Sequence, residues 1–167
     1  HRDFVTFQLE SAAENVRQLH RLACDVVERP VTLSANTSLP TPMHMVVAPS
    51  VSYLIGEVEQ CAPEGVAKSG NAVVAYRLAE ALGKPLAATP FGADWAYVKD
   101  YEPLNLVKYW IAQAYACGQR LMAPAKMWCY YPETGTDYYY GPTEVFAPMY
   151  QFIRRYARYF DGYRSAG

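Results

Sequence analysis

The sequence alternates amphipathic helical segments with short apolar segments, and this alternation limits the possible folds more than any other feature. Three times, apolar residues at helical spacing lead into a breaker and then into a short apolar stretch. The second helical pattern ends at Gly83 and the third at Gly118, because glycine enters the left-handed conformation that closes helices without strain. The first pattern places on one face Ala12, Val16, Leu19, Ala23 and Val26. Such alternation predicts β/α units with parallel strands.

Four apolar segments are the predicted strands, near residues 31–36, 53–58, 86–89 and 120–124. Each is short and nearly all apolar, which is typical of strands covered on both faces. One or two helical turns are expected around Met43–Ala48, and a final helix from about Thr143 to Phe160.

Four strands fit either half of an eight-stranded barrel or a four-stranded doubly wound sheet. We favour the barrel, because no glycine-rich phosphate loop follows any strand. The expected fold is therefore α/β with parallel strands, the C-terminal half of a TIM barrel, in a single domain over residues 1–167.

The amino-acid composition limits the classes of binding partner that we expect for this chain. Fifteen Lys and Arg balance sixteen Asp and Glu without a basic run, so nothing attracts nucleic acid or an anionic membrane surface. A hydrophobic content of 51% excludes disorder, and no apolar run approaches the roughly 18 residues of a membrane span. We expect a small-molecule or protein partner, with no nucleic acid, membrane or cofactor.

The cysteines and the first residue bear on the origin of the chain. Cys24, Cys61, Cys117 and Cys129 form no C-x-x-C pair, which favours free thiols over a disulfide framework and leaves the compartment open. The chain begins at His1 without a methionine or a signal-peptide pattern. We interpret it as a piece of a longer protein.

Polar and aromatic residues follow each predicted strand. In a barrel the carboxyl ends of all strands lie at the same face, which carries the active site. Successive strand residues point to opposite faces, so Glu57 and Glu59 share one face at a strand end. The complete set is Asn36 and His44, Glu57 and Glu59, Asp94 and Trp95, and Lys126, Trp128 and Tyr130.

These residue types suit a sugar site. Pyranose rings stack on Trp and Tyr, and their hydroxyls bond to Asn, Asp, Glu and Lys. A pair of carboxyl groups breaks glycosidic bonds, and the candidates are Glu57, Glu59 and Asp94. The candidates for substrate binding are Asn36, His44, Trp95, Lys126, Trp128 and Tyr130. No His-x-His or His-x-x-x-His spacing supports a metal site.

Each candidate also has a structural interpretation. The two glutamates would then be surface residues, Asp94 a helix cap, Asn36 a turn residue and His44 a packed side chain. Trp110 lies on the apolar stripe of its helix and is expected in the core. The tyrosine-rich segment 126–140 is expected to be a loop that stacks on substrate or contacts another part of the protein.

Four segments resemble the closing portion of bacterial barrel-type glycoside hydrolases of the agarase, porphyranase and β-galactosidase-like kind. They are Val107–Gly118, Leu121–Trp128, Phe146–Arg154 and Tyr159–Tyr163, within a resemblance over roughly residues 53–163. The resemblance implies that Trp128 lines the sugar site after the last strand. It also implies that Glu57 is the acid/base, and it leaves the second carboxylate to Asp94 or to a preceding half of the barrel.

The resemblance makes a glycoside hydrolase, incomplete as this chain, the leading expectation. Its partners are a carbohydrate substrate and either the missing N-terminal half of the barrel or a second copy. The alternative is a non-catalytic carbohydrate-binding or assembly module that uses the aromatic segment 126–140.

Overall fold

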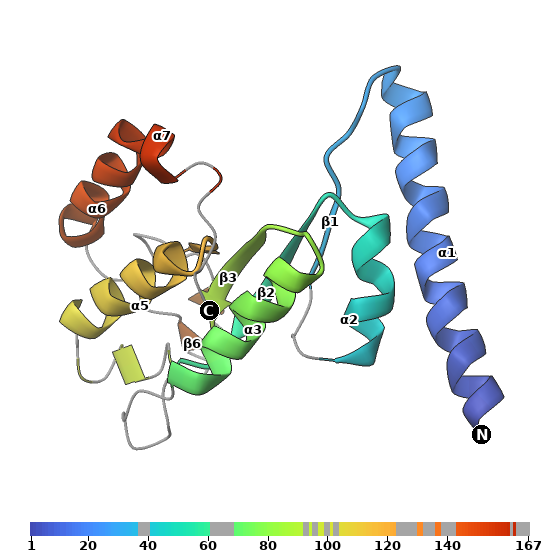
Figure 1. Ribbon diagram of the computed structural model, residues 1–167, viewed down its shortest axis with the longest axis horizontal. Helices are drawn as coiled ribbons and strands as arrows, with labels where there is room; N and C mark the ends of the chain where they lie inside the picture. Colours follow the sequence, from blue (N-terminus) through green and yellow to red (C-terminus); the bar gives the residue numbers. More distant parts are fainter. Residues whose placement is uncertain are drawn as a thin grey trace.

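The computed structural model describes residues 1–36, 41–60, 69–91, 94, 97–98, 101, 104–122, 130–131, 136–137, 143–160 and 162. Helices and strands alternate along the chain (Figure 1). The helices are α1 (Arg2–Val27), α2 (Pro42–Val47), the 3-10 turn η1 (Ala48–Ser50), α3 (Ser69–Ala81), α5 (Leu104–Ala116), α6 (Thr143–Arg155) and α7 (Ala157–Phe160). The strands are β1 (Ser34–Asn36), β2 (Tyr53–Val58), β3 (Leu86–Pro90), β4 (Arg120–Leu121), β5 (Tyr130–Tyr131) and β6 (Thr136–Asp137).

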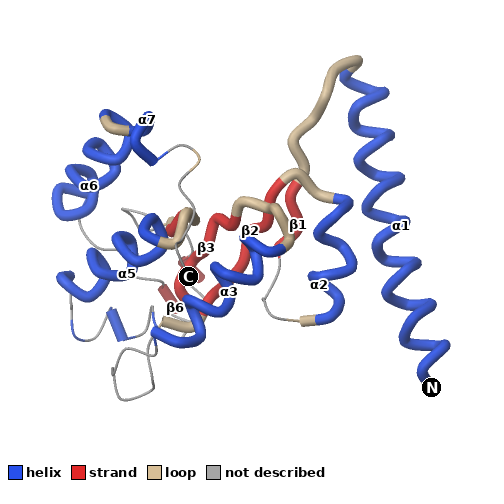
Figure 2. The backbone as a smooth tube through the Cα atoms, in the orientation of Figure 1, coloured by secondary structure: helices blue, strands red, loops and turns tan. Residues whose placement is uncertain are grey.

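The main sheet has four parallel strands in the order β1-β2-β3-β4, which confirms the expected α/β class (Figure 2). Connections between parallel strands are right-handed in nearly all proteins. Because the order follows the chain without reversal, right-handed connections place their helices on one face of the sheet. A doubly wound sheet reverses its order at a switch point, and the four described strands contain no such reversal.

Burial along β2 and β3 shows that the two faces differ. Leu54, Gly56 and Val58 are buried, whereas Tyr53 and Ile55 are only partly buried and Glu57 is exposed. In β3, Leu86, Ala88 and Pro90 are buried, and the two residues between them are partly exposed. The expectation of coverage on both faces was therefore wrong for the described residues, because the described helices cover only one face. We call the other the open face.

The strand bounds agree with the sequence at β2 and differ at both edges of the sheet. Residues 53–58 form β2 as expected, and β3 extends one residue beyond the expected 86–89. Near 31–36, pairing begins only at Ser34, and the carbonyl oxygen of Val31 lies 2.7 Å from His20 Nε2 on α1. Near 120–124, β4 contains only two residues.

The core lies between the covered face and the helices. Trp110 and Ile111 of α5 are fully buried with Tyr76 of α3 and with Leu54 and Leu86 of the strands. The expectation that Trp110 belongs to the core is confirmed. Cys24 and Cys117 are partly buried free thiols.

Helix α1 departs from the expected packing. Its contacts are mainly with α2 and η1, and Ala13 is its only buried residue. Two members of the predicted apolar face, Leu19 and Val26, are 55% and 73% exposed. The periodicity was correct, but within the described structure one side of this helix has no packing partner.

Two further expectations need correction. The final helix is divided into α6 and α7 around Tyr156. The segment 126–140 is not entirely a loop, because β5 and β6 pair antiparallel, with Tyr130 opposite Asp137 and Tyr131 opposite Thr136. Tyr and Thr favour extended backbone, which explains the pairing.

The expected turns around Met43–Ala48 are present as α2 and η1. No described helix is long and apolar enough to cross a membrane.

The end of α1 generates a stability prediction. Glu28 caps this helix in the left-handed conformation with φ of 51°, which costs free energy for a residue with a long side chain and none for glycine. We expect Glu28→Gly to raise the free energy of unfolding by about 1 kcal/mol, measured by urea denaturation. Glu28→Ala removes the same carboxylate without relieving φ and serves as the control. Equal stability of the two variants would contradict the strain at this position.

Candidate active site

The two strand-end glutamates lie on the open face. Glu57 is an exposed residue of β2, and Glu59 follows the end of that strand and is partly buried. The alternate residues Gly56, Val58 and Gln60 are buried in the opposite direction. The structure therefore places both carboxylates on one face of the sheet, at the carboxyl end of β2.

Neighbouring strands bring two polar residues to the same face. In a parallel ladder, residues in register share a face. Asn36, exposed at the end of β1, is in register with Ile55, and Thr89 of β3 is in register with Glu57. Sequence reasoning missed Thr89, although it is the only hydroxyl residue in an otherwise apolar predicted strand.

Asp94 lies in the interior of the protein. It is completely buried. Its Oδ2 accepts hydrogen bonds from the backbone N–H of Gln60 at 2.9 Å and of Phe91 at 3.0 Å. This carboxylate therefore joins the segment after β2 to the segment after β3. The structural interpretation as a backbone cap describes its position better than a substrate-facing role.

Gln60 extends this buried polar connection to α3. Its side chain is 2% exposed, and its Nε2 donates a hydrogen bond to the hydroxyl oxygen of Tyr76 at 3.3 Å. Burial raises the pKa of Tyr76 to about 12. Asp94, Gln60 and Tyr76 together fix the backbone on which Glu59 is carried.

His44 is placed as a packed helix residue. It lies in the first turn of α2, is partly buried, and has its Nδ1 2.6 Å from Thr41 Oγ1. Thr41 is the N-cap of the helix. The short contact occupies one ring nitrogen of His44 with a local helix-start interaction.

The remaining predicted site residues are not placed. Trp95, Lys126 and Trp128 lie outside the described residues, and Tyr130 is described only through its backbone pairing in β5. The described part of the chain brings together no group of three His, Cys, Asp or Glu side chains that could hold a metal ion. The placed chemistry is thus a pair of glutamates with a neighbouring amide and hydroxyl.

Comparison with known proteins indicates a distant relationship to a glycoside hydrolase. The chain is 27% identical over 141 residues to an alpha-agarase from Alteromonas agarilytica. The alignment covers 83% of this chain and 10% of the agarase, so the chain spans a small part of that relative's length. No family model matches the chain, and no solved structure is significantly similar to it.

The buried carboxylate yields a second prediction. Asp94→Ala would leave the buried N–H of Gln60 and the part-buried N–H of Phe91 without this acceptor. We expect a loss of about 3 kcal/mol in the free energy of unfolding, measured by urea denaturation. Asp94→Asn keeps an acceptor oxygen and should lose less. An Asp94→Ala variant as stable as the parent would show that the connection is not stabilising.

Tyr76 yields a prediction about alkaline pH. The unfolded chain releases the Tyr76 proton near pH 10, whereas the folded chain holds it to about pH 12. Its contribution to stability is therefore complete below pH 10 and is lost as the pH rises towards 12, by about 2 to 3 kcal/mol. Urea denaturation across this range should show a smaller decrease for Tyr76→Phe. Equal decreases in both proteins would contradict the raised pKa.

Proposed function

We propose that this chain is part of a carbohydrate-active hydrolase in which the open face of the sheet, at the carboxyl ends of the strands, holds the sugar. The observation that carries the proposal is the position of Glu57 and Glu59. Both extend from the uncovered face where a parallel sheet ends, and in β/α folds this end carries the chemistry. The distant relationship to an alpha-agarase supports a polysaccharide as substrate.

In this proposal Glu57 is the acid/base. Glycoside hydrolysis needs one carboxyl group to protonate the leaving oxygen and a second on the other side of the scissile bond. Glu57 is the more exposed of the two glutamates and lies in register with Thr89. The Thr89 hydroxyl and the Asn36 amide are suited to bind sugar hydroxyls beside it.

The second carboxylate is proposed to come from across the open face. Glu59 extends from the same face of the same segment, with its Cα about 6.6 Å from that of Glu57. Two parallel side chains cannot flank one bond from opposite sides, and Asp94 is buried and held by backbone N–H groups. Glu59 then contributes a binding or electrostatic role, and the opposing group is proposed to lie outside the described residues.

The same proposal makes the sheet an arc of a (β/α)₈ barrel. Four parallel strands in chain order, with helices on one face only, have the arrangement that such an arc requires. Trp95, Lys126, Trp128 and Tyr130 are proposed as sugar-stacking and hydroxyl-binding groups at its rim. His44 is a weaker candidate, because it contacts the N-cap of its own helix.

The test is hydrolysis of agarose oligosaccharides and aryl glycosides by the chain joined to its natural upstream sequence. We expect Glu57→Gln to lower kcat by about 100- to 10,000-fold, as loss of a general acid/base does. Glu10→Gln, on the exposed side of α1, is the control and should retain activity. Full activity in Glu57→Gln and Glu59→Gln would remove both residues from the mechanism.

The aromatic segment distinguishes the alternative function. If the protein is a non-catalytic carbohydrate-binding module, calorimetry should detect oligosaccharide binding that Trp128→Ala abolishes, while no product forms. Product formation by the extended protein would exclude this alternative.

A further inference from the structure

Phe91 is an aromatic residue at the carboxyl end of β3, one position past the strand. It is 49% exposed, whereas Pro90 before it is fully buried. Alternation along β3 places Ala87 and Thr89 on the open face, and Phe91 continues that alternation. Phe91 therefore extends the open face beyond the last residue of the strand.

The register of the sheet sets Phe91 opposite Glu59. The two central strands are paired up to Val58 and Pro90, so the next pair along the two segments is Glu59 with Phe91. Both belong to the alternation that places Glu57 on the open face. The end of the sheet thus presents an aromatic ring across from a carboxylate.

Asp94 fixes both backbone polar groups of Phe91. The N–H of Phe91 donates to Asp94 Oδ2 at 3.0 Å, and its carbonyl oxygen accepts from the N–H of Asp94 at 2.9 Å. The same Oδ2 accepts from the N–H of Gln60, the residue after Glu59, at 2.9 Å. Because the two donors share one oxygen atom, the segments that carry Phe91 and Glu59 are held beside each other. The protein therefore sets the position of Phe91 before any ligand binds.

The neighbours of Phe91 on the open face are polar. Glu59 lies opposite, and Glu57 with Thr89 forms the preceding pair in register. An apolar protein surface placed on this ring would also cover the carboxylates and remove their hydration, which is unfavourable. A pyranose ring suits both kinds of neighbour, because its C–H face stacks on an aromatic ring while its hydroxyls bond to polar side chains.

We propose that Phe91 is the stacking platform of a subsite for the sugar unit next to the cleaved bond. The inference rests on the proposed function, in which Glu57 protonates the leaving oxygen and Thr89 binds a sugar hydroxyl beside it. Phe91 and Glu59 lie two residues further along the strands, about 6.6 Å beyond that pair, which is a step on the scale of one sugar unit. The polysaccharide then runs along the strand direction, out over the carboxyl ends of β2 and β3.

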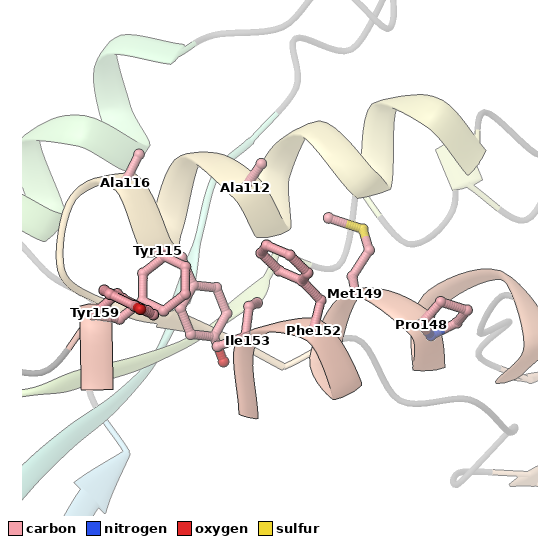
Figure 3. Close-up of a pocket in the computed structure, with 9 residues that line it drawn as sticks. Ala112, Tyr115, Ala116, Pro148, Met149, Phe152, Ile153 and Tyr159 are labelled. Carbon is pink, nitrogen blue, oxygen red and sulfur yellow. The ribbon is translucent and has the colours of Figure 1, made fainter. Parts of the chain in front are cut away.

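The apolar groove between α5 and the pair α6 and α7 provides a contrast. It has a volume of about 640 Å³, and Figure 3 shows Met149 and Phe152 pointing towards α5, with Tyr115 and Tyr159 at one end. The described residues that line it include no carboxylate or amide side chain to hold sugar hydroxyls. Phe152 is 56% exposed, so it resembles Phe91 in exposure but not in its neighbours.

The test is the affinity for agarose oligosaccharides of the chain joined to its natural upstream sequence. Calorimetry is done in the Glu57→Gln variant, so that the ligand is not consumed. Phe91→Ala should raise Kd about 10-fold, because it removes the stacking surface. Phe91→Tyr keeps an aromatic ring and should stay within about threefold of the parent. Phe152→Ala removes a similarly exposed ring from the groove and is the matched control.

Kinetics and stability separate a lost binding surface from a structural defect. In the protein that retains Glu57, Phe91→Ala should raise KM about 10-fold and change kcat by less than about threefold, because it removes substrate binding rather than a group that acts only in the transition state. Alanine retains both backbone hydrogen bonds to Asp94, so urea denaturation should give a free energy of unfolding close to that of the parent.

The outcomes distinguish the subsite from the proposed function. Hydrolysis by the parent, with Kd and KM unchanged in Phe91→Ala, would overturn the subsite alone. An equal loss of affinity in Phe91→Ala and Phe91→Tyr, or in Phe152→Ala, would also overturn it. A parent protein that neither binds nor hydrolyses the oligosaccharides would overturn the proposed function and the subsite with it.

Discussion

The sequential order of the parallel strands is the constraint on which the rest of the molecule depends. With right-handed connections, β1-β2-β3-β4 places the helices on one face, and the core forms between that face and α3 and α5. The open face then carries whatever side chains alternate with the core residues. Gly56 and Val58 on either side of Glu57 are buried in the core, and because strand residues alternate between faces, Glu57 is exposed on the opposite face. The candidate chemistry is thus a direct consequence of the one-sided arrangement.

A buried polar connection holds the carboxyl ends of the central strands together. Asp94 accepts hydrogen bonds from the segments that follow β2 and β3, and Gln60 continues to Tyr76 on α3. Buried polar groups are stabilising only when their partners are present. Here the partners are backbone N–H groups at the end of the sheet where Glu57 and Glu59 lie. The backbone that carries Glu59 is therefore held by buried hydrogen bonds to two other segments.

The same one-sided arrangement leaves apolar surface exposed at both ends of the sheet. At the β1 end, α1 packs mainly against α2 and η1 and exposes Leu22 and Val26. At the β4 end, α5 and α6 leave an apolar groove. Apolar surface of this extent is unfavourable in water. Both apolar surfaces are therefore uncovered within the described residues.

The sequence by itself determined the α/β class, the bounds of β2, the core position of Trp110 and the shared face of the two glutamates. These features follow from local periodicity, because spacing of 3.6 or 2 residues fixes which side chains share a face. Tertiary structure alone decided that Asp94 is buried while Glu57 is exposed, since both follow apolar strands and only packing between segments separates them. It also decided that the apolar face of α1 is largely uncovered. Periodicity reveals that a helix has an apolar face, but the presence of a partner depends on elements distant in the chain.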